Sequence, residues 1–300
     1  MESFLNIMLE DELVEDRNND VEPSSMWLID KDVIQPTTSI KITNTLQPGV
    51  YIADEDRNGV YCKKINIEID SLYKFSDSII IKLVDEINNF WNKKELFSSK
   101  NLIHKRGILL EGFPGTGKTS IISLISKEII NKGGIVFKVS SPRNLLTYIN
   151  FIQNYFRKIE PTTPVITIIE DIDKYQDVES EFLDFLDGKS QINHHVVITT
   201  SNNTEEISNT FLRPSRLDLC IKVPLPNELT RREYFINKEV PEDQIDKLVE
   251  VTDSMSLADL KEIYICVFLL DYSIEEAINK ISDPYIKQNY LKVKTKSISI

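Results

Sequence analysis

One short segment constrains the fold of this chain more than any other, the turn EGFPGTGKTS at residues 111–120. It follows the apolar run GILLE at 107–111 and precedes SIISLISKEII at 120–130, whose apolar residues recur with helical spacing. The turn satisfies the pattern G-x-x-x-x-G-K-[ST], and a chance match is rare in a chain with only 9 glycines in 300 residues. A strand, this turn and a helix in that order predict a phosphate-binding loop in an α/β fold.

The residue types of this loop suit a nucleoside triphosphate with its Mg²⁺ ion. Glycine adopts positive φ and lets backbone N–H groups approach an anion closely. Lys118 is expected to reach the β and γ phosphates, and the Thr119 hydroxyl is expected to bind Mg²⁺. The predicted nucleotide-binding residues are Gly112, Phe113, Pro114, Gly115, Thr116, Gly117, Lys118, Thr119 and Ser120.

Three carboxylates follow a second apolar run, VITII at 165–169. They are Glu170, Asp171 and Asp173. The carboxyl ends of parallel strands meet at the edge of the sheet where ligands bind, so the acids should face the phosphate loop. A bound Mg²⁺ offsets their mutual repulsion. We expect one of the first two acids to hold the metal and the other to orient the attacking water.

Short apolar runs alternate with helical segments through the middle of the chain. Because these runs are continuously apolar, they predict a parallel sheet buried on both faces. After residue 227 the pattern becomes helical, with capping signals at Ser256/Asp259 and Ser273/Glu276. The five expected strands are GILLE at 107–111, IVFKV at 135–139, VITII at 165–169, VVITT at 196–200 and LCIKV at 219–223.

Four regions are expected along the chain. Residues 1–37 are interpreted as an acidic, flexible arm, because residues 1–32 hold ten acidic and two basic residues. Residues 38–75 are interpreted as a small β element, either a structural addition or a docking module. Residues 76–227 should form the α/β nucleotide-binding core, and residues 228–300 a helical lid.

Composition excludes several classes of protein. Hydrophobic residues make up 41% and charged residues 27%, as in globular proteins, and no apolar run is long enough for a membrane span. The N-terminus lacks a basic secretory signal, and three scattered cysteines favour a reducing cytoplasm. The net charge of −12 makes nucleic acid a less favoured partner. His194 and His195 are interpreted as a solvated turn rather than metal ligands.

Taken together, residues 100–265 resemble the AAA branch of the AAA+ ATPases. The resemblance rests on GFPGTGKTS, IIEDID, FLDFLDG at 182–188 and TTSNNTEEISNTFLRPSRLD at 199–218. It implies ATP and Mg²⁺ as cofactors and a ring homo-oligomer of six copies. It also implies that Asn202 contacts the γ-phosphate or the attacking water, and that Arg213 and Arg216 reach the nucleotide of the neighbouring copy.

The chain departs from the family pattern at its acids. Most members end this strand in Asp-Glu, whereas this chain has Glu170-Asp171. In this order of the two acids the chain resembles the branch of the family that contains the mitochondrial translocase of the Rieske protein. We therefore assign Glu170 to the metal and Asp171 to the water, and we expect Asp173 to cap or pair structurally. Ser215 stands where a glycine is usual. Tyr148 is a candidate pore residue, although an amphipathic helix face is the favoured interpretation.

These observations predict a Mg²⁺-dependent ATPase that remodels or moves a protein partner. The predicted catalytic residues are Lys118, Glu170, Asp171, Asn202, Arg213 and Arg216, and the predicted metal ligands are Thr119 and Glu170. Two alternatives remain open at this point. One is a DNA- or RNA-directed motor or loader, and the other is a nucleotide-gated scaffold with very slow hydrolysis.

Overall fold

The computed structural model describes residues 26–30, 33–37, 43–57, 59–66, 79–187, 191–202 and 209–282, and the chain divides into two units, 1–44 and 45–300. In the first unit, strands β1 (Met26–Asp30) and β2 (Val33–Thr37) pair antiparallel. The rest of the predicted acidic arm lies outside the described residues. The other described elements belong to the second unit, which carries the candidate site.

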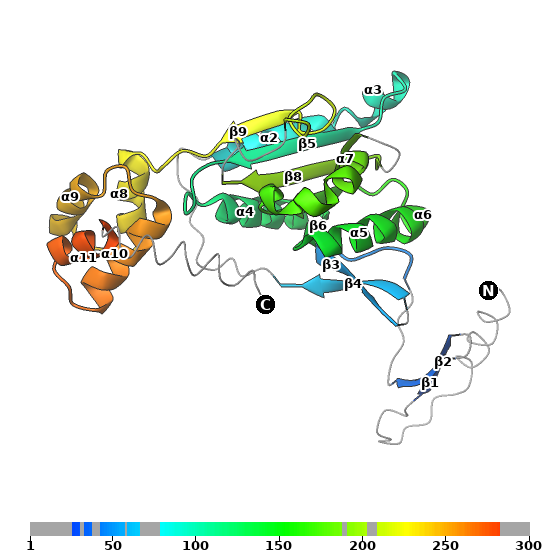
Figure 1. The fold of residues 1–300 in the computed structure, drawn as a ribbon, viewed down its shortest axis with the longest axis horizontal. Helices are drawn as coiled ribbons and strands as arrows, with labels where there is room; N and C mark the ends of the chain where they lie inside the picture. Colours follow the sequence, from blue (N-terminus) through cyan, green and yellow to red (C-terminus); the bar gives the residue numbers. More distant parts are fainter. Residues whose placement is uncertain are drawn as a thin grey trace. The chain divides into compact units, whose positions relative to one another are not determined.

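The second unit is built on a seven-stranded sheet of order β4-β3-β6-β7-β8-β5-β9 (Figure 1). Its five predicted strands are present, and all their pairings with one another are parallel. The prediction of an α/β fold on a parallel sheet is therefore confirmed. These strands are β5 (Lys105–Glu111), β6 (Ile135–Val139), β7 (Val165–Ile169), β8 (His195–Ser201) and β9 (Leu219–Lys222).

The sheet has two more strands than expected, because a hairpin from the predicted small β element joins it. Strands β3 (Gly49–Asp56) and β4 (Gly59–Ile65) pair antiparallel, and β3 also pairs parallel with β6. Val50, Tyr51 and Ala53 of β3 are buried in the core, so apolar burial attaches the hairpin to the sheet. Residues 38–42, 58 and 67–75 of the predicted small β element lie outside the described residues.

Helices cover both faces of the sheet, because consecutive strand residues point to opposite sides. Ile108, Val136 and Ile166 pack with α2 and α4, whereas Leu109, Phe137 and Val165 pack with α5, η1 and α7 (Figure 1). The core thus has three layers. Its helices are α2 (Ile79–Trp91), α3 (Lys94–Ser99), α4 (Lys118–Asn131), α5 (Pro142–Phe151), π-helical η1 (Ile152–Phe156), α6 (Arg157–Ile159), 3-10 η2 (Ile172–Val178) and α7 (Glu179–Asp187).

The helical lid has its own apolar cluster, which includes Phe235, Leu248 and Leu260. Both predicted capping signals are formed, since Ser256 and Asp259 bond reciprocally, as do Ser273 and Glu276. The described lid helices are α8 (Glu228–Asn237), α9 (Glu242–Val251), α10 (Leu257–Leu269) and α11 (Ile274–Ser282).

The interpretation of His194 and His195 as a solvated turn is wrong. Their exposed fractions are 6% and 0%, and His195 begins β8. Burial follows from the parallel sheet, because the strand that these histidines enter, β8, lies inside the sheet between β7 and β5. The described residues also contain no group of three His, Cys, Asp or Glu side chains that could hold a metal ion.

Candidate functional site

The phosphate loop connects the carboxyl end of β5 to the first residue of α4. Gly115 and Gly117 have φ values of 81° and 92°, a conformation that side-chain-bearing residues seldom adopt. Thr116 Oγ1 donates to the Phe113 carbonyl over 2.9 Å and braces the turn. The loop therefore presents backbone at a helix N-terminus, as an anion site requires.

Lys118 lies folded beneath this loop. Its Nζ donates to the carbonyls of Gly112 and Phe113 over 2.7 and 3.0 Å, and to Asn202 Oδ1 over 2.9 Å. Only 7% of the lysine is exposed. The structure thus places the predicted phosphate-binding lysine beside the predicted γ-phosphate sensor. The ammonium group now donates to carbonyl and amide oxygens, and the oxygens of a bound phosphate could accept from it in the same way.

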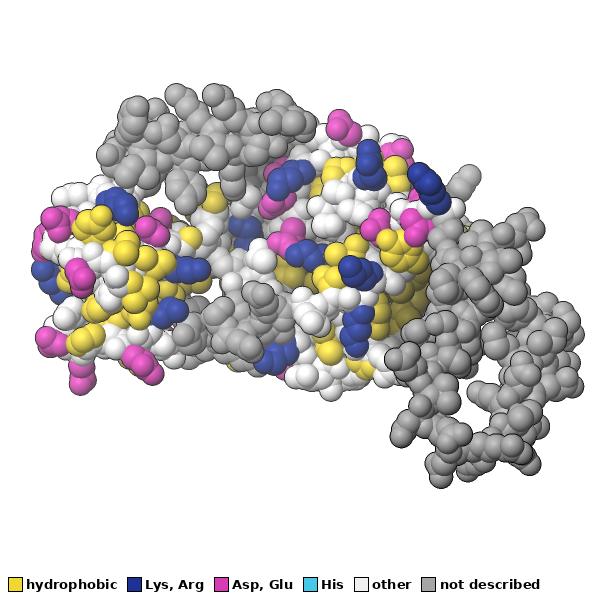
Figure 2. Space-filling view, turned by 90° about the horizontal axis from the view of Figure 1, so that it is seen from below, with side chains coloured by type: hydrophobic (Ala, Val, Ile, Leu, Met, Phe, Trp, Pro, Cys, Tyr) yellow, Lys and Arg dark blue, Asp and Glu magenta, His cyan; other side chains and the backbone are white. Residues whose placement is uncertain are grey.

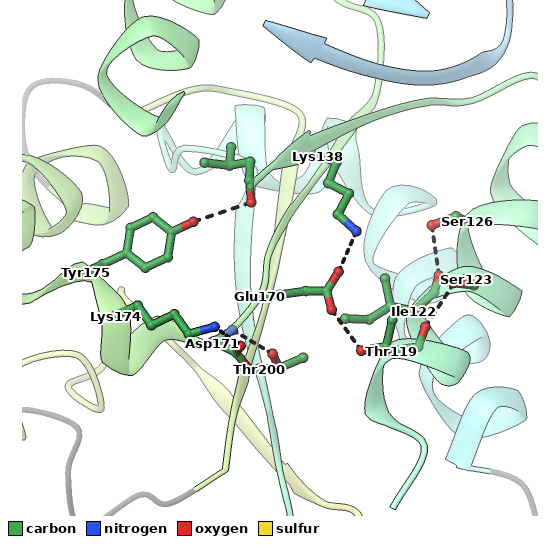
Figure 3. A network of polar contacts seen from close by, with 11 residues as sticks. Thr119, Ile122, Ser123, Ser126, Lys138, Glu170, Asp171, Lys174, Tyr175 and Thr200 are labelled. Atoms are coloured by element: carbon green, nitrogen blue, oxygen red, sulfur yellow. Dashed lines mark hydrogen bonds and ion pairs between the residues drawn. The ribbon is translucent and has the colours of Figure 1, made fainter. Parts of the chain in front are cut away.

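Glu170 and Thr119 meet across the site although they belong to different elements. Thr119 Oγ1, in the first turn of α4, donates to Glu170 Oε2 over 2.8 Å (Figure 3). A hydroxyl and a carboxylate are hard oxygen donors of the kind that Mg²⁺ prefers. This donor pair fits the metal ion that the phosphate loop implies, and Thr119 and Glu170 would hold it.

Asp171 occupies a separate corner of the site. Its backbone has φ 54° and ψ 62°, and its N–H donates to Thr200 Oγ1 over 2.9 Å. One carboxylate oxygen pairs with Lys174 at 2.5 Å, and the other accepts from Asn202 Nδ2 at 3.5 Å. The two consecutive acids therefore have different partners, Thr119 for Glu170 and Lys174 with Asn202 for Asp171.

A pocket of about 390 Å³ joins these groups to the lid. From the core it is lined by Gly115, Gly117, Lys118, Thr119, Ser120, Asp171, Thr200 and Asn202. From the lid it is lined by Tyr234, Lys238, Leu257, Ala258 and Lys261. Gly112, Phe113, Pro114 and Thr116 support the loop without lining the pocket. Pockets of this size accept small-molecule ligands.

The lid approaches the loop closely at Gly115. Ala258 N–H donates to the Gly115 carbonyl over 3.2 Å, and a Cβ on Gly115 would lie 2.7 Å from Ser256 Oγ. Glycine is required there for its backbone angle and for space. The sequence interpretation missed Lys261, although it stands one helical turn after Ala258 and therefore on the same face of α10.

Asp173 lies outside this arrangement. It does not line the pocket. The expected structural pairing is absent for its buried Oδ1, which has no hydrogen-bond partner among the described residues.

The two predicted arginines lie away from this pocket. The Arg216 carbonyl lies so near Gly107 that a Cβ there would approach it to 1.8 Å, and Gly107 stands in the first half of β5. The phosphate loop begins at Gly112, five residues further along, or roughly 16 Å of strand. Neither arginine lines the pocket of its own chain, and the backbone of Arg216 lies far from the phosphate loop.

The arginines differ in their partners. Arg216 Nε pairs with Asp187 at 2.5 Å, and its guanidinium also donates to the Thr210 carbonyl over 2.7 Å. Arg213 is exposed, and its side chain has no hydrogen bond or ion pair within the described part of the chain. Arg216 thus anchors the turn in which both stand, whereas Arg213 is available to an external group.

Residue 215 lies between the two arginines in the left-handed region, with φ 75°. The glycine usual at this position would adopt that angle more easily. Two side chains hold Ser215 in place instead, since its N–H donates to Asp218 Oδ1 over 2.9 Å and its carbonyl accepts from Lys105 over 2.6 Å. Lys105 is itself buried, which lowers its pKa.

The structure contradicts a pore role for Tyr148. Only 1% of this residue is exposed, and its hydroxyl contacts Thr167 Oγ1 inside the core. The connection from β6 to α5 consists of Ser140 and Ser141 and carries no aromatic residue. The favoured interpretation of Tyr148 as part of an amphipathic helix face is therefore correct.

The described residues contain no helix long and apolar enough to cross a membrane.

Comparisons with known proteins agree with this geometry. Residues 108–225 match the ATPase family associated with various cellular activities (AAA). A cell division cycle protein 48 homologue from Archaeoglobus fulgidus is 31% identical over 192 residues, which are 56% of this chain and 26% of that protein. A 26S proteasome regulatory subunit 4 homologue B from Arabidopsis thaliana is 27% identical over 265 residues, which are 78% and 59% of the two chains.

A proteasome-activating nucleotidase from Methanopyrus kandleri is 24% identical over 267 residues, which are 78% of this chain and 60% of that protein. The chain thus spans between a quarter and three fifths of the length of these relatives. The matched segment contains the phosphate loop, both acids, Asn202 and both arginines in the expected order. Residues 108–225 of this chain are thus similar to an AAA ATPase domain.

Proposed function

We propose that this chain is a Mg²⁺-dependent ATPase that works as a ring of identical copies, six in number as the resemblance implies, and remodels a protein partner. The observation that carries the proposal is the meeting of three pairs of groups beside one pocket. These pairs are Lys118 with the phosphate loop, Thr119 with Glu170, and Asp171 with Asn202.

Each pair has a distinct task in this proposal. The ammonium of Lys118 holds the β and γ phosphates, and its present backbone acceptors give way to phosphate oxygens. Thr119 and Glu170 hold Mg²⁺, which neutralises charge on the transferring phosphoryl group. Asp171 orients the attacking water, and Asn202 positions Asp171 and the γ-phosphate. Lys261 of the lid adds positive charge on the opposite wall.

The placement of the arginines supports a site shared between copies. Arg213 and Arg216 stand near the amino end of β5, and the pocket lies at its carboxyl end. The turn that carries Arg213 and Arg216 is called the arginine turn. A second copy that brings its arginine turn to this pocket would supply the forked, permanently charged group that stabilises phosphoryl transfer. Figure 2 shows hydrophobic side chains gathered over the lid, a surface such a ring could bury. The lid's large exposed apolar residues are Leu229, Ile236, Leu269, Leu270 and Tyr272.

A protein is the proposed partner for two reasons. Two relatives are named as a proteasome regulatory subunit homologue and a proteasome-activating nucleotidase, and the net charge of −12 disfavours nucleic acid. Because the β6–α5 connection is only two residues long, it offers no aromatic loop for threading. The partner is therefore expected to engage another surface of the ring.

Phosphate release tests the proposal. Wild-type protein at a concentration that allows assembly is expected to release phosphate from ATP only when Mg²⁺ is present. Asp171→Asn should lower the rate by on the order of 100-fold, within the usual range for a group that positions the nucleophile. Its affinity for a fluorescent ATP analogue should stay within about threefold of wild type, because the phosphate contacts of Lys118 are retained.

Mixed assemblies test the shared site. Arg213→Ala and Asp171→Asn are each expected to be slow alone, and mixing them should restore part of the activity because some pockets then combine an intact arginine with an intact Asp171. Well-mixed assemblies without recovery would contradict the role across copies. Tight ATP binding with no wild-type turnover would instead support the nucleotide-gated scaffold.

A further inference from the structure

Glu170 has a second partner that the sequence pattern did not indicate. Lys138 Nζ lies 2.7 Å from Glu170 Oε1, while the Thr119 hydroxyl donates to the other oxygen, Oε2 (Figure 3). The exposed fraction of the side chain is 35% for Lys138 and 22% for Glu170. Both oxygens of the proposed metal ligand are thus occupied within the protein.

The sheet itself brings this lysine to the acid. Lys138 stands on β6 directly beside Ile168 of β7, and Glu170 follows β7. Every other residue of β6 is buried, so Lys138 is the one polar side chain in an apolar strand. The apolar stem of a lysine can pack along such a strand while its ammonium group extends beyond the apolar surface. Glu170 is the partner that the structure supplies.

The ion pair bears directly on divalent cations. An ionised carboxylate beside a hydroxyl oxygen attracts such an ion even without nucleotide. An ammonium on the same carboxylate opposes this, because it repels the incoming cation and satisfies one of the oxygens. A bound triphosphate carries enough negative charge to shift the balance toward the metal.

We propose that Lys138 is a placeholder cation for Glu170, which keeps the metal position closed to divalent ions until a nucleotide brings Mg²⁺ with it. This inference rests on the proposed Mg²⁺–ATP function and assigns Lys138 as a positioning residue within it. Metal binding then becomes conditional on nucleotide. The alternative is that Lys138 merely braces β6 against β7, in which case it affects stability and not cation affinity.

The ion pair of the second acid, Asp171, differs from that of Glu170. Lys174 pairs with Asp171 from only three residues along the chain, and 65% of its side chain is exposed. Such a pair is loosely held and is weakened by salt. Lys138 comes from a separate strand and is half as exposed, so it alone is positioned by the sheet.

Mn²⁺ titration of the nucleotide-free full chain, followed by electron paramagnetic resonance, tests this directly. Lys138→Met is expected to bind Mn²⁺ at least about fivefold more tightly than wild type, because the repelling charge is removed. Lys138→Arg should match wild type. Adding Glu170→Gln to Lys138→Met should abolish the gain.

A matched control removes a lysine from an equally short ion pair elsewhere. Lys247 lies 2.6 Å from Glu275 on the lid, far along the chain from the site, so Lys247→Met should leave Mn²⁺ binding unchanged. Lys138→Gln is a second neutral variant in case the methionine variant does not fold, and circular dichroism reports folding of each protein.

Two results would overturn the placeholder role. One is an unchanged Mn²⁺ affinity in folded Lys138→Met and Lys138→Gln. The other is a gain that persists when Glu170 is also replaced. Because these titrations contain no nucleotide, they stay informative even if the wild type proves unable to hydrolyse ATP, which would contradict the proposed function alone.

Discussion

The two edges of the central sheet use polar residues in opposite ways. At the carboxyl edge, the acids and lysines line or border an open pocket, and their partners are groups that a ligand could replace. At the amino edge, His104, His194 and His195 are buried and bond to other protein groups. Polar groups whose partners a ligand can replace are available for chemistry, whereas buried polar groups that bond to other protein groups contribute to stability.

His104 and His194 illustrate the buried pairing at the amino edge. His104 stacks on Phe90 with ring centroids 3.9 Å apart, and its Nε2 lies 2.9 Å from the Phe90 carbonyl. A carbonyl only accepts, so His104 carries its proton on Nε2, and its Nδ1 accepts from His194 Nδ1 over 3.2 Å. Protonating His104 would place two N–H groups face to face. Burial lowers the pKa of both His104 and His194, which favours the neutral form of each ring in the folded protein.

The arginine turn at the amino edge contains both kinds of polar group, those bonded within the chain and one available to a partner. Lys105, Asp187 and Asp218 hold it from within the chain, while Arg213 is exposed. Arg213 is thus available to an external group, and in the proposed ring a neighbouring pocket would use it. This contrast between the two kinds of polar group leads to four predictions.

The largest effect is expected at the carboxyl edge. Lys118→Ala should weaken ATP binding by about 100-fold, because it removes at least two charged hydrogen bonds to phosphate worth roughly 1.5 kcal/mol each. Titration with a fluorescent ATP analogue measures this. Lys247→Ala, on an exposed lid pair, is the control and should bind like wild type. Retained tight binding by Lys118→Ala would show that these polar groups do not serve a ligand.

The second prediction concerns acid sensitivity at the amino edge. Burial, followed by the charge of Lys94, lowers the pKa of His194 from 6.5 to about 4. The unfolded state therefore binds the proton first, so this contribution to stability is complete above pH 6.5 and is lost as the pH falls toward 4. The loss is at most about 1.4 kcal/mol for each pH unit.

Urea unfolding at several pH values measures that loss. His194→Asn keeps a side chain that tolerates the φ of 55° at this position and removes the titrating ring. Its free energy of unfolding should fall less between pH 6.5 and 5 than that of wild type. Carboxylates titrate in both proteins, so the difference isolates the histidine. If the free energy of unfolding changes equally with pH in both proteins, burial does not lower the pKa of His194.

The third prediction separates the two arginines. Arg216→Ala should lower the free energy of unfolding by about 1–2 kcal/mol, because the charge of Asp187 then lacks a partner in a partly buried site. Arg213→Ala should change it by less than about 0.5 kcal/mol, as expected for an exposed residue. Chemical denaturation of both variants tests this. Equal destabilisation would remove the distinction between anchor and available group.

The smallest effect is expected from the lid. Lys261→Ala should weaken ATP binding by about threefold, because an exposed lysine contributes a modest, salt-screened attraction to the triphosphate. The difference from wild type should shrink in 0.5 M salt, where the screening length is on the order of 4 Å. A loss that does not respond to salt would indicate a packing role for Lys261 instead.

Much of the carboxyl edge could be predicted because its signals are local. The phosphate loop, Glu170, Asp171 and Asn202 each follow an apolar run, and the ends of parallel strands converge. Lys138 could not be found in this way. Its partner lies 32 residues away, and only strand pairing brings the two together.

The amino edge was predicted poorly for the same physical reason. An adjacent histidine pair after a polar stretch is usual in a turn, and its burial depends on His104, Thr167 and Phe185, which come from distant segments. The joining of β3 to the sheet was equally hidden, because alternating apolar residues do not specify which strand they will pair with.

The amino-acid sequence by itself determined the parallel α/β core, the nucleotide loop, the two acids and the capped lid helices, because each depends on residues close together in the chain. Only the tertiary structure decided which lysine meets which acid, which arginine is anchored and which histidines are buried. Those outcomes depend on contacts between segments far apart in the sequence, where burial and charge pairing, rather than local backbone preference, set the energy.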